Sequence, residues 1–521
     1  MIVASGTLLS RVTGLVRVLV TLAVLGGSKL TDIYTGANNM PNIVFELLLG
    51  GVLTASIMPI FVTAHEDRDT RAVASVFMVA MTVLVLLSGA AMIAAPALTS
   101  VFTDRMASGT AVEIANKAQA RELGILFVRV FMPQMLFYGI TAIASAALNA
   151  RRRFVAAAYL PILNNLVVVV AMLLLRNRQA HPTIASLLDD RTALWLVAVG
   201  TTAGIAVTAL GFAVPLARNR VPVFSQGASW RHPSIRRLIT LSGWTIGYVV
   251  SNQLALSFVQ WITSGEQGTL TYYTYAFIFF QLPHGLIAVS IMTTVGREMT
   301  SAAAARDVVR LRTHYDQGLR YLIIGMVPAA AGLIALARPI TDLAVGYGNF
   351  NSAAAHQTSI ALQSFAFGLV PFSVYLYTLR VYYAHGDART PFRLNCIENL
   401  CNIALAAVLF PQFGLRGLAL AFSFAYLVGA AVALSSVRRL IAPAESFLAA
   451  YGPSIARASV SAALAAAVAW TATNVVSDGP VGTVAACGVA LATYATLLML
   501  MRSPEFSGLR ARLAEKRSVD M

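Results

Sequence analysis

Two arginines interrupt the first apolar stretch of the sequence. Arg11 and Arg17 are the only charged residues between positions 5 and 26. A charge at the centre of a membrane-spanning helix costs ~2.5–3.5 kcal/mol on insertion scales, so such residues face a cavity or a partner. Six residues along a helix turn its face by roughly 120°, so both side chains share one broad face. Two guanidinium forks there favour an anionic, phosphate-bearing ligand. A structural ion pair with Glu46 or Asp32 is the alternative.

Three more ionisable residues fall within apolar segments, namely Glu46, Arg129 and Glu398. Arg129 lies nearer a helix end and is the weaker ligand candidate. Glu46, beside a cavity with two arginines, is predicted to be ionised and paired with one of them. An arriving anionic substrate would then exchange one partner for another without leaving a buried charge bare, which is the costly outcome.

A second group of polar residues follows later in the chain. Asn395 and Asn399 are four residues apart on one helix face, and Glu398 is three residues from Asn395. Oxygen ligands of this kind suit a monovalent cation such as sodium. Hydrogen bonding between helices, which is common for Asn in membranes, is the alternative reading.

The segments that carry these residues are too apolar for a soluble protein. The chain has 521 residues, of which 58% are hydrophobic and 12% charged, whereas a soluble domain carries about 25% charged residues. Apolar runs of about 20 residues are long enough to cross a bilayer. The sequence therefore predicts an all-α polytopic membrane protein with about 14 transmembrane helices. We place them near 5–26, 38–64, 72–97, 122–149, 155–175, 192–216, 237–263, 269–296, 317–341, 355–384, 391–410, 416–437, 455–475 and 480–501.

Basic residues predict the orientation of these spans. If the N-terminus is cytoplasmic, 26 of the 38 Lys and Arg fall in inner loops and the C-terminal tail, and nine fall in outer loops. Lys and Arg gather on the cytoplasmic side, so both termini are predicted to be cytoplasmic. The net charge of +16 is explained by topology, and no nucleic-acid partner is expected.

A repeat indicates two halves of six helices. Five residues of the fourth and fifth spans recur 238 positions later: Pro133, Ala150, Arg151, Phe154 and Asn164 become Pro371, Ala388, Arg389, Phe392 and Asn402. Each half has an even number of helices, so the two halves have the same orientation in the membrane, as in parallel-repeat transporters. We predict lobes at 1–220 and 221–440, related by a pseudo-twofold axis along the membrane normal, and two further helices with a basic tail at 441–521. A channel is the structural rival.

The sequence lacks the motifs of an enzyme or an ATP-driven pump. It has only three lysines and no GxxxxGK[ST] loop, HExxH pair or nucleophile elbow. Its three cysteines match no metal or disulfide pattern. We therefore expect a transporter with no catalytic residues, metal or cofactor, driven by a sodium or proton gradient or by the membrane potential.

Several motifs resemble the MurJ/MviN family of flippases over essentially the whole chain. The opening from Ser10 to Arg17 resembles the family's SRxxGxxR start. Thr31-Asp32, followed by Ala37 to Asn42, resembles TDxxxxAxxxPN. The segment from Leu126 through Arg129 and Pro133 to Pro161 resembles the family's fourth-to-fifth helix signature.

The resemblance implies the multidrug/oligosaccharidyl-lipid/polysaccharide exporter fold and a bacterial inner-membrane location. It implies flipping of lipid II, the undecaprenyl-pyrophosphate-linked peptidoglycan precursor, by alternating access during cell-wall synthesis. Cell-wall synthesis and division proteins are candidate partners. With the resemblance, the candidate substrate contacts are Arg11, Arg17, Asp32, Asn42, Glu46 and Arg129.

Two departures make the expected cavity less basic than the family pattern. Many relatives carry arginine after the Pro41-Asn42 pair and before the proline of the eighth span, where this chain has Ile43 to Glu46 and Ala276 to Leu282. A flippase for another polyprenyl-linked glycan is the main alternative. A drug/cation antiporter of the same fold would favour an acidic cavity, and a non-transporting scaffold for cell-wall enzymes would not need buried arginines.

Overall fold

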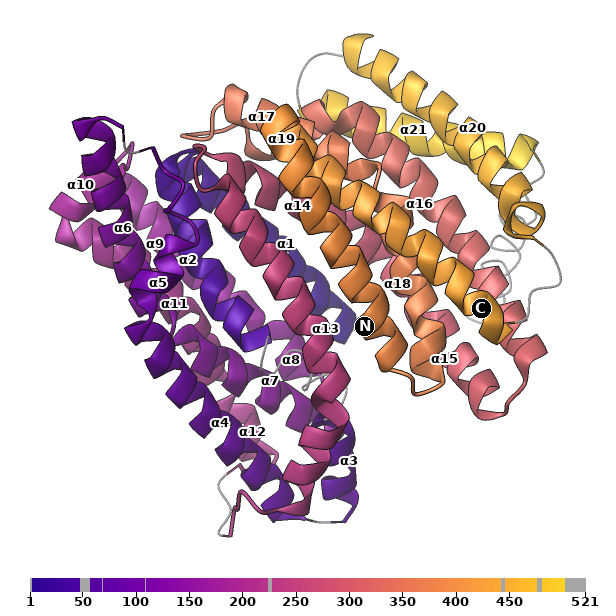
Figure 1. Ribbon diagram of the computed structural model, residues 1–521, viewed down its shortest axis with the longest axis horizontal. Helices are drawn as coiled ribbons and strands as arrows, with labels where there is room; N and C mark the ends of the chain where they lie inside the picture. Colours follow the sequence, from indigo (N-terminus) through magenta and orange to yellow (C-terminus); the bar gives the residue numbers. More distant parts are fainter. Residues whose placement is uncertain are drawn as a thin grey trace. The chain divides into compact units, whose positions relative to one another are not determined.

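The chain is all-helical throughout the part that the structure describes. A computed structural model gives residues 2–46, 57–67, 69–107, 109–223, 227–441, 446–475 and 480–501, and no strand occurs among them (Figure 1). Two compact units are present: Met1–Thr271 with Tyr347–Asn351, and Tyr272–Gly346 with Ser352–Met521. The two units are defined by contacts between residues in space, and their boundaries differ from those of the sequence repeat. The lobes predicted at 1–220, 221–440 and 441–521 therefore stay a prediction.

The first unit contains thirteen helices among its described residues. They are α1 (Ile2–Leu25), α2 (Lys29–Phe45), α3 (Met58–Glu66), α4 (Thr70–Ile93), α5 (Ala95–Ser100), α6 (Ala111–Phe131), α7 (Gln134–Ala150), α8 (Val155–Tyr159), α9 (Pro161–Arg178), α10 (Ile184–Asp189), α11 (Arg191–Gly211), α12 (Ala213–Arg218) and α13 (Pro233–Thr263). The helix α14 (Thr269–Pro283) begins here and continues into the second unit.

The second unit continues the chain. It holds the π-helical turn η3 (His284–Ala288), α15 (Val289–Ala304), α16 (Val308–Val345), α17 (Ser352–Ala366), α18 (Leu369–Ala384), α19 (Arg389–Ile441), α20 (Phe447–Val475) and α21 (Pro480–Leu500). The last two helices lie beside α16, with α20 against both α16 and α21 (Figure 1).

The described helices confirm the polytopic class but not the number of spans. Ten of them are long and apolar enough to cross a membrane, and the bent pair α17–α18 makes eleven. Gly414, with φ 53°, breaks α19 between the predicted spans 391–410 and 416–437. The predicted span 38–64 includes residues 47–56, which lie outside the described residues. Fourteen spans therefore remain a prediction.

Several helices start at an acidic or hydroxyl cap, as their sequences require. Asp69 accepts from the amides of Arg71 and Ala72 at the start of α4. Asp190 caps α11 and also accepts from Nε of Arg178 at 2.5 Å. The hydrogen bond from Arg178 and those from the helix amides lower the pKa of Asp190 to about 2. The contribution of this cap to stability is therefore complete above the ordinary Asp pKa of 3.8 and is lost as the pH falls from there through about 2.

Three helices of the described chain end on an arginine with left-handed backbone. Arg152, Arg220 and Arg306 have φ of 59°, 48° and 56° and follow α7, α12 and α15. At each end the next amide bonds back five residues, for example from Arg153 to the Leu148 oxygen at 2.9 Å. A cation there interacts favourably with the negative end of the helix. All three lie in loops that the charge pattern predicts to be cytoplasmic.

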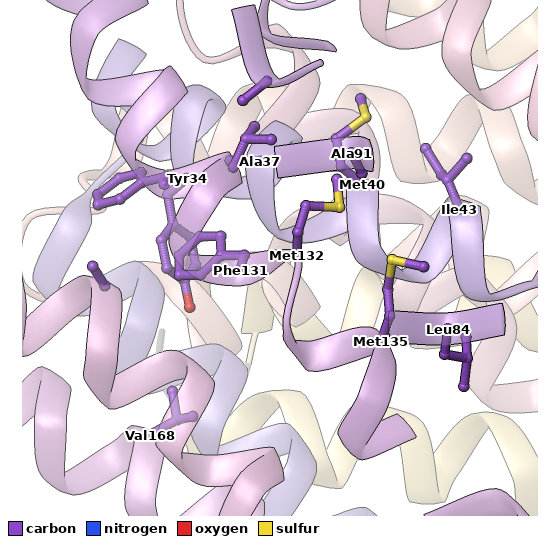
Figure 2. Close-up of a cluster of buried hydrophobic side chains, with 14 of the residues drawn as sticks. Tyr34, Ala37, Met40, Ile43, Leu84, Ala91, Phe131, Met132, Met135 and Val168 are labelled. Carbon is purple, nitrogen blue, oxygen red and sulfur yellow. The ribbon is translucent and has the colours of Figure 1, made fainter. Parts of the chain in front are cut away.

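The core of the first unit joins α2, α4, α6, α7 and α9. Figure 2 shows Met40 of α2, Met135 of α7 and Leu84 of α4 in one buried cluster. Small residues let neighbouring helices approach closely. A Cβ on Gly204 of α11 would lie 2.5 Å from Oδ1 of Asn164 on α9. The asparagine of the first repeat copy therefore sits at a close helix crossing.

The buried cluster of the first unit includes methionines, whereas the second unit has a buried cluster of aromatic side chains. Its rings come from α14, α17, α18 and α19, with neighbouring ring centres 4.6–6.0 Å apart: Phe277, Phe280, Phe365, Phe372, Phe422 and Tyr426. Pro283 ends α14 one residue before the π-helical turn, because proline supplies no amide for the helical ladder.

Candidate functional site

The helix α1 is fixed in the first unit by one polar, small-residue face. Ser5 Oγ lies 2.9 Å from the Tyr159 hydroxyl, and Nδ2 of Asn165 donates to Oγ1 of Thr13 at 3.0 Å. A Cβ on Gly6 would lie 2.4 Å from the Tyr159 ring, so only glycine permits this contact. These contacts with α8 and α9 set the rotation of α1 about its axis.

With α1 held in this way, its two arginines have different surroundings. Arg11 is exposed, whereas Arg17 is half-buried. The charge of Arg17 acts on the hydroxyl groups of Tyr34 and Tyr138. Arg17 therefore belongs to a polar cluster inside the unit.

That cluster includes one of the residues expected from the motifs. The side chain of Asn42, from α2, is within hydrogen-bonding reach of the Tyr138 hydroxyl on α7. Tyr138 donates to Gln134 Oε1 at 3.1 Å, and Gln134 Nε2 donates to Thr202 Oγ1 at 3.2 Å. Two hydroxyls and two amides thus meet among α2, α7 and α11, and the charge of Arg17 on α1 acts on the Tyr138 hydroxyl of this group. This set of groups can bind phosphate or sugar oxygens.

Glu46 does not form the ion pair that we expected. It lies exposed at the C-terminal end of α2, and the described side chains include no carboxylate–guanidinium contact within 4.0 Å between Glu46 and Arg11 or Arg17. The expectation of a pair rested on burial of Glu46, and its exposed position removes that reason. Arg129, in the last turn of α6, is also exposed and has no ion pair among these residues.

Asp32 is a buried carboxylate that accepts three hydrogen bonds. Its oxygens accept from the amide of Gly268 at 2.6 Å, the amide of Thr271 at 3.0 Å and the hydroxyl of Thr271 at 2.7 Å. The side chain is only 4% exposed. Gly268 has φ 77°, a conformation that favours glycine. Asp32 thereby ties the start of α2 to the turn between α13 and α14.

Further contacts close the same end of the unit. Lys29 Nζ donates to the Ser264 oxygen at 2.6 Å and lies 4.0 Å from the Asp32 carboxylate. The guanidinium of Arg105 stands 4.8 Å over the Trp261 ring, where a cation–π contact is favourable. Asn349 Nδ2 donates to the carbonyls of Val24 and Ala180 at 2.6 and 2.7 Å. We refer to the contact of Asp32 and Lys29 with residues 264–271 as the Asp32 latch.

The second polar group lies in the second unit. Asn395, Glu398 and Asn399 are all buried on α19, and Asn399 Nδ2 donates to the Asn395 backbone oxygen at 3.1 Å. Glu398 is 1% exposed and packs against Gly429, where a Cβ would lie 3.2 Å from its Cγ. Oε2 of Glu398 and Oδ1 of Asn402 have no hydrogen-bond donor. Two such buried acceptors suit a proton or a small monovalent cation. No cluster of three His, Cys, Asp or Glu side chains occurs among the described residues to hold a metal.

Sequence reasoning found the charged members of these sites but missed their neutral partners. Tyr138, Gln134 and Thr271 show no motif, and their only signal is polarity within or beside an apolar segment. The donor at Gly268 is a backbone amide, so the sequence gives no indication of it beyond the glycine itself. Such partners become visible only when distant helices are brought together.

Solved structures share this fold. A structure described as lipid II flippase MurJ in an inward closed conformation aligns with a TM-score of 0.75 and 19% identity, over 96% of this chain and 98% of the other. An inward-facing multidrug resistance MATE transporter of the MOP superfamily aligns with a TM-score of 0.67 and 16% identity, over 84% and 96%. These likenesses show the fold of a multi-pass α-helical membrane protein.

Comparison of the amino-acid sequence with family models identifies the family of this chain. The model of the family Lipid II flippase MurJ matches residues 22–489. The chain therefore belongs to the MurJ family, as its motifs led us to expect. A probable lipid II flippase MurJ of Vibrio cholerae is 25% identical over 432 residues, 81% of this chain and 79% of the relative. One of Rhizobium tropici is 28% identical over 432 residues, 80% and 76% of the two chains.

The Asp32 latch predicts a specific effect of removing one charge. Asp32→Asn keeps the size of the side chain but replaces one acceptor oxygen with an amide NH2 group, which faces donors that need an acceptor. We expect the free energy of unfolding to fall by about 1–3 kcal/mol. Hydrogen exchange, followed by mass spectrometry, should accelerate at residues 264–271. The control is Asp104→Asn, whose exposed side chain makes no such contacts and should leave exchange there unchanged. Equal exchange in the two variants would show that the latch is not held by Asp32.

Proposed function

We propose that this protein flips lipid II from the inner to the outer leaflet of the bacterial cytoplasmic membrane for cell-wall synthesis. The observation that carries the proposal is Arg17, half-buried in a polar cluster inside a chain of the lipid II flippase MurJ family. It acts as a transporter and makes or breaks no covalent bond.

Arg17 and Arg11 supply the chemistry that a pyrophosphate needs. A guanidinium can donate two parallel hydrogen bonds to one phosphate group, and Arg remains charged in any protein environment. Asn42 and the Tyr138 hydroxyl add neutral polar groups to the surroundings of Arg17. Asp32 is engaged in the latch in this conformation, so its part in transport is to keep one end closed until substrate binding favours opening. Alternating access then requires the latch bonds to break and reform.

Two other substrates remain as alternatives within the same fold. Another polyprenyl-linked glycan would present the same pyrophosphate, so the arginines do not discriminate against it. The likeness to a multidrug resistance MATE transporter makes a drug/cation antiporter the second alternative. A cationic drug requires an anionic site, however, and the polar cluster of α1 carries a guanidinium. The first alternative is therefore the stronger one.

The arginines should be essential for transport and dispensable for folding. We expect Arg17→Ala to lower lipid II flipping in proteoliposomes at least about tenfold, because it removes charge-assisted hydrogen bonds. The same variant should fail to support growth of cells depleted of their own lipid II flippase. Arg17→Lys should rescue poorly because an ammonium cannot form the paired contact. Arg11→Ala should behave alike.

Arg176→Ala is the matched control, because Arg176 is exposed near the end of α9 and forms no ion pair within the described chain. It should flip and complement normally at equal protein level. Wild-type flipping by both the Arg11 and Arg17 alanine variants would refute the substrate-contact assignment. Equal flipping of a short-chain phosphatidylcholine would refute specificity for lipid II.

We also propose that Glu398, with Asn395 and Asn399, couples transport to a monovalent cation or a proton. A buried, ionised carboxylate without a partner is costly, and no Lys, Arg or His lies within 4.0 Å of Glu398 among the described residues. A bound proton or sodium ion would neutralise it. Exchange of that ion across the membrane would then supply the driving force.

Glu398→Gln should separate coupling from substrate binding. The variant is neutral in every state, so flipping should lose its dependence on a sodium or pH gradient while lipid II binding persists. Glu122→Gln, on the exposed face of α6, is the control and should keep the dependence. If wild-type flipping responds to neither gradient, the asparagines and Glu398 serve helix packing instead.

The proposed orientation has both ends of the chain in the cytoplasm. In a variant with Cys396, Cys401 and Cys487 changed to serine, Lys29→Cys should react with an impermeant thiol reagent in intact spheroplasts. Arg152→Cys should react only after the membrane is opened. Labelling of position 152 from outside would reverse the orientation derived from the charge distribution.

A further inference from the structure

Asn165 of α9 holds the turn of α1 that carries Arg11. Its side-chain amide donates from Nδ2 to the backbone oxygen of Ser10 at 3.2 Å and to Oγ1 of Thr13 at 3.0 Å. The asparagine is only 6% exposed, so the amide that makes these bonds is buried. One neutral side chain of α9 thus binds two residues of α1, one on either side of Arg11.

The apolar side chains of α1 do little to fix its rotation about the helix axis. Lipid tails are as apolar as leucine, so these side chains gain little by facing α9 instead of lipid, and close packing and hydrogen bonds between helices make the choice. The close contact of Gly6 with the Tyr159 ring acts near the beginning of α1. The Asn165 bonds act one to two turns further along, next to the arginines. A single buried asparagine can fix the register of packed helices in this way.

The rotation that Asn165 fixes at Thr13 carries over to Arg17. Thr13 and Arg17 are four positions apart, so they lie on the same helix face, one turn from each other. Arg17 is half-buried, and its charge acts on the hydroxyl groups of Tyr34 and Tyr138. A rotation of α1 about its axis would turn the guanidinium away from these hydroxyls. Asn165 therefore controls the direction of a charged side chain on another helix.

The bonds of Asn165 contribute more to this orientation than to stability. Thr13 Oγ1 itself donates to the Ser10 oxygen at 3.1 Å. If the amide of Asn165 is removed, the Thr13 hydroxyl and the Ser10 oxygen still have each other as partners. The large penalty of a buried polar group without a partner is then avoided.

We propose that Asn165 is a positioning residue for lipid II flipping, which keeps α1 in the rotation in which Arg17 faces the substrate. This role rests on the proposed function, in which Arg17 contacts lipid II. Without the Asn165 bonds, α1 spends part of its time in rotations that cannot bind, and the apparent affinity for lipid II falls with the fraction of competent molecules. The rate at saturating lipid II does not fall, because the bound substrate then selects the competent rotation.

The test measures the rate of flipping by the full-length protein in proteoliposomes against the density of lipid II, together with Tm. Asn165→Leu removes both bonds to α1, and we expect it to raise KM about fivefold or more while kcat and Tm stay near wild type. Thr13→Val removes one of the two bonds and should raise KM less. Combining the two changes should have no more effect than Asn165→Leu alone, because they remove the same contact.

Two matched variants keep the contact and should have the KM of the wild type. Thr13→Ser retains the hydroxyl, and Ser10→Ala retains the backbone oxygen that Asn165 binds. A lowered Tm and kcat at unchanged KM in Asn165→Leu would indicate a merely structural role and overturn the proposal.

The two Thr13 variants decide the matter if Asn165→Leu does not fold. A raised KM in Thr13→Val with a wild-type KM in Thr13→Ser supports the positioning role, and equal KM values overturn it. Wild-type KM in both Asn165→Leu and Thr13→Val, with flipping impaired in Arg17→Ala, would overturn the role of Asn165 and leave the proposed function intact. Absence of lipid II flipping by the wild-type protein would refute the proposed function, and the role of Asn165 with it.

Discussion

A buried carboxylate must find hydrogen-bond donors, and Asp32 finds its donors more than 230 residues away in the chain. The amides of Gly268 and Thr271 and the Thr271 hydroxyl surround it within 3.0 Å. Removing a single partner of such a group leaves an uncompensated charge, which costs far more than the bond itself contributes. The latch is therefore either complete or open. A closure with two discrete states, rather than a gradual one, is what alternating access requires.

The same constraint has a different solution at each charged site. Arg17 is only half-buried and is surrounded by neutral hydroxyls and amides, so its charge remains available to an anion. Glu398 is buried and its Oε2 has no hydrogen-bond donor among the described residues, which is the basis for proposing it as the coupling site. Arg320 is held by a backbone carbonyl and a tyrosine ring. The placement of charge, more than the apolar packing, distinguishes the functional parts of this protein.

The sequence predicted the features that depend on local or periodic patterns. Apolar runs of about 20 residues predicted an all-helical membrane fold, and the spacing of Arg11 and Arg17 identified the polar helix in the first unit. Features that depend on long-range contacts were not accessible. The predicted pairing of Glu46 with an arginine was wrong, because burial cannot be read from sequence and Glu46 is exposed. The donors for Asp32 are backbone amides, which every residue except proline carries.

In the proposed mechanism, lipid II flipping requires the Asp32 latch to open. A variant without the native cysteines that carries Lys29→Cys and Ser264→Cys can be joined across the latch with a reducible thiol crosslinker that spans a lysine side chain, because Lys29 Nζ donates to the backbone carbonyl of Ser264. Lipid II flipping is then measured in proteoliposomes before and after reduction. We predict that the crosslinked protein does not flip lipid II and that reduction restores flipping. Undiminished flipping by fully crosslinked protein would contradict the account.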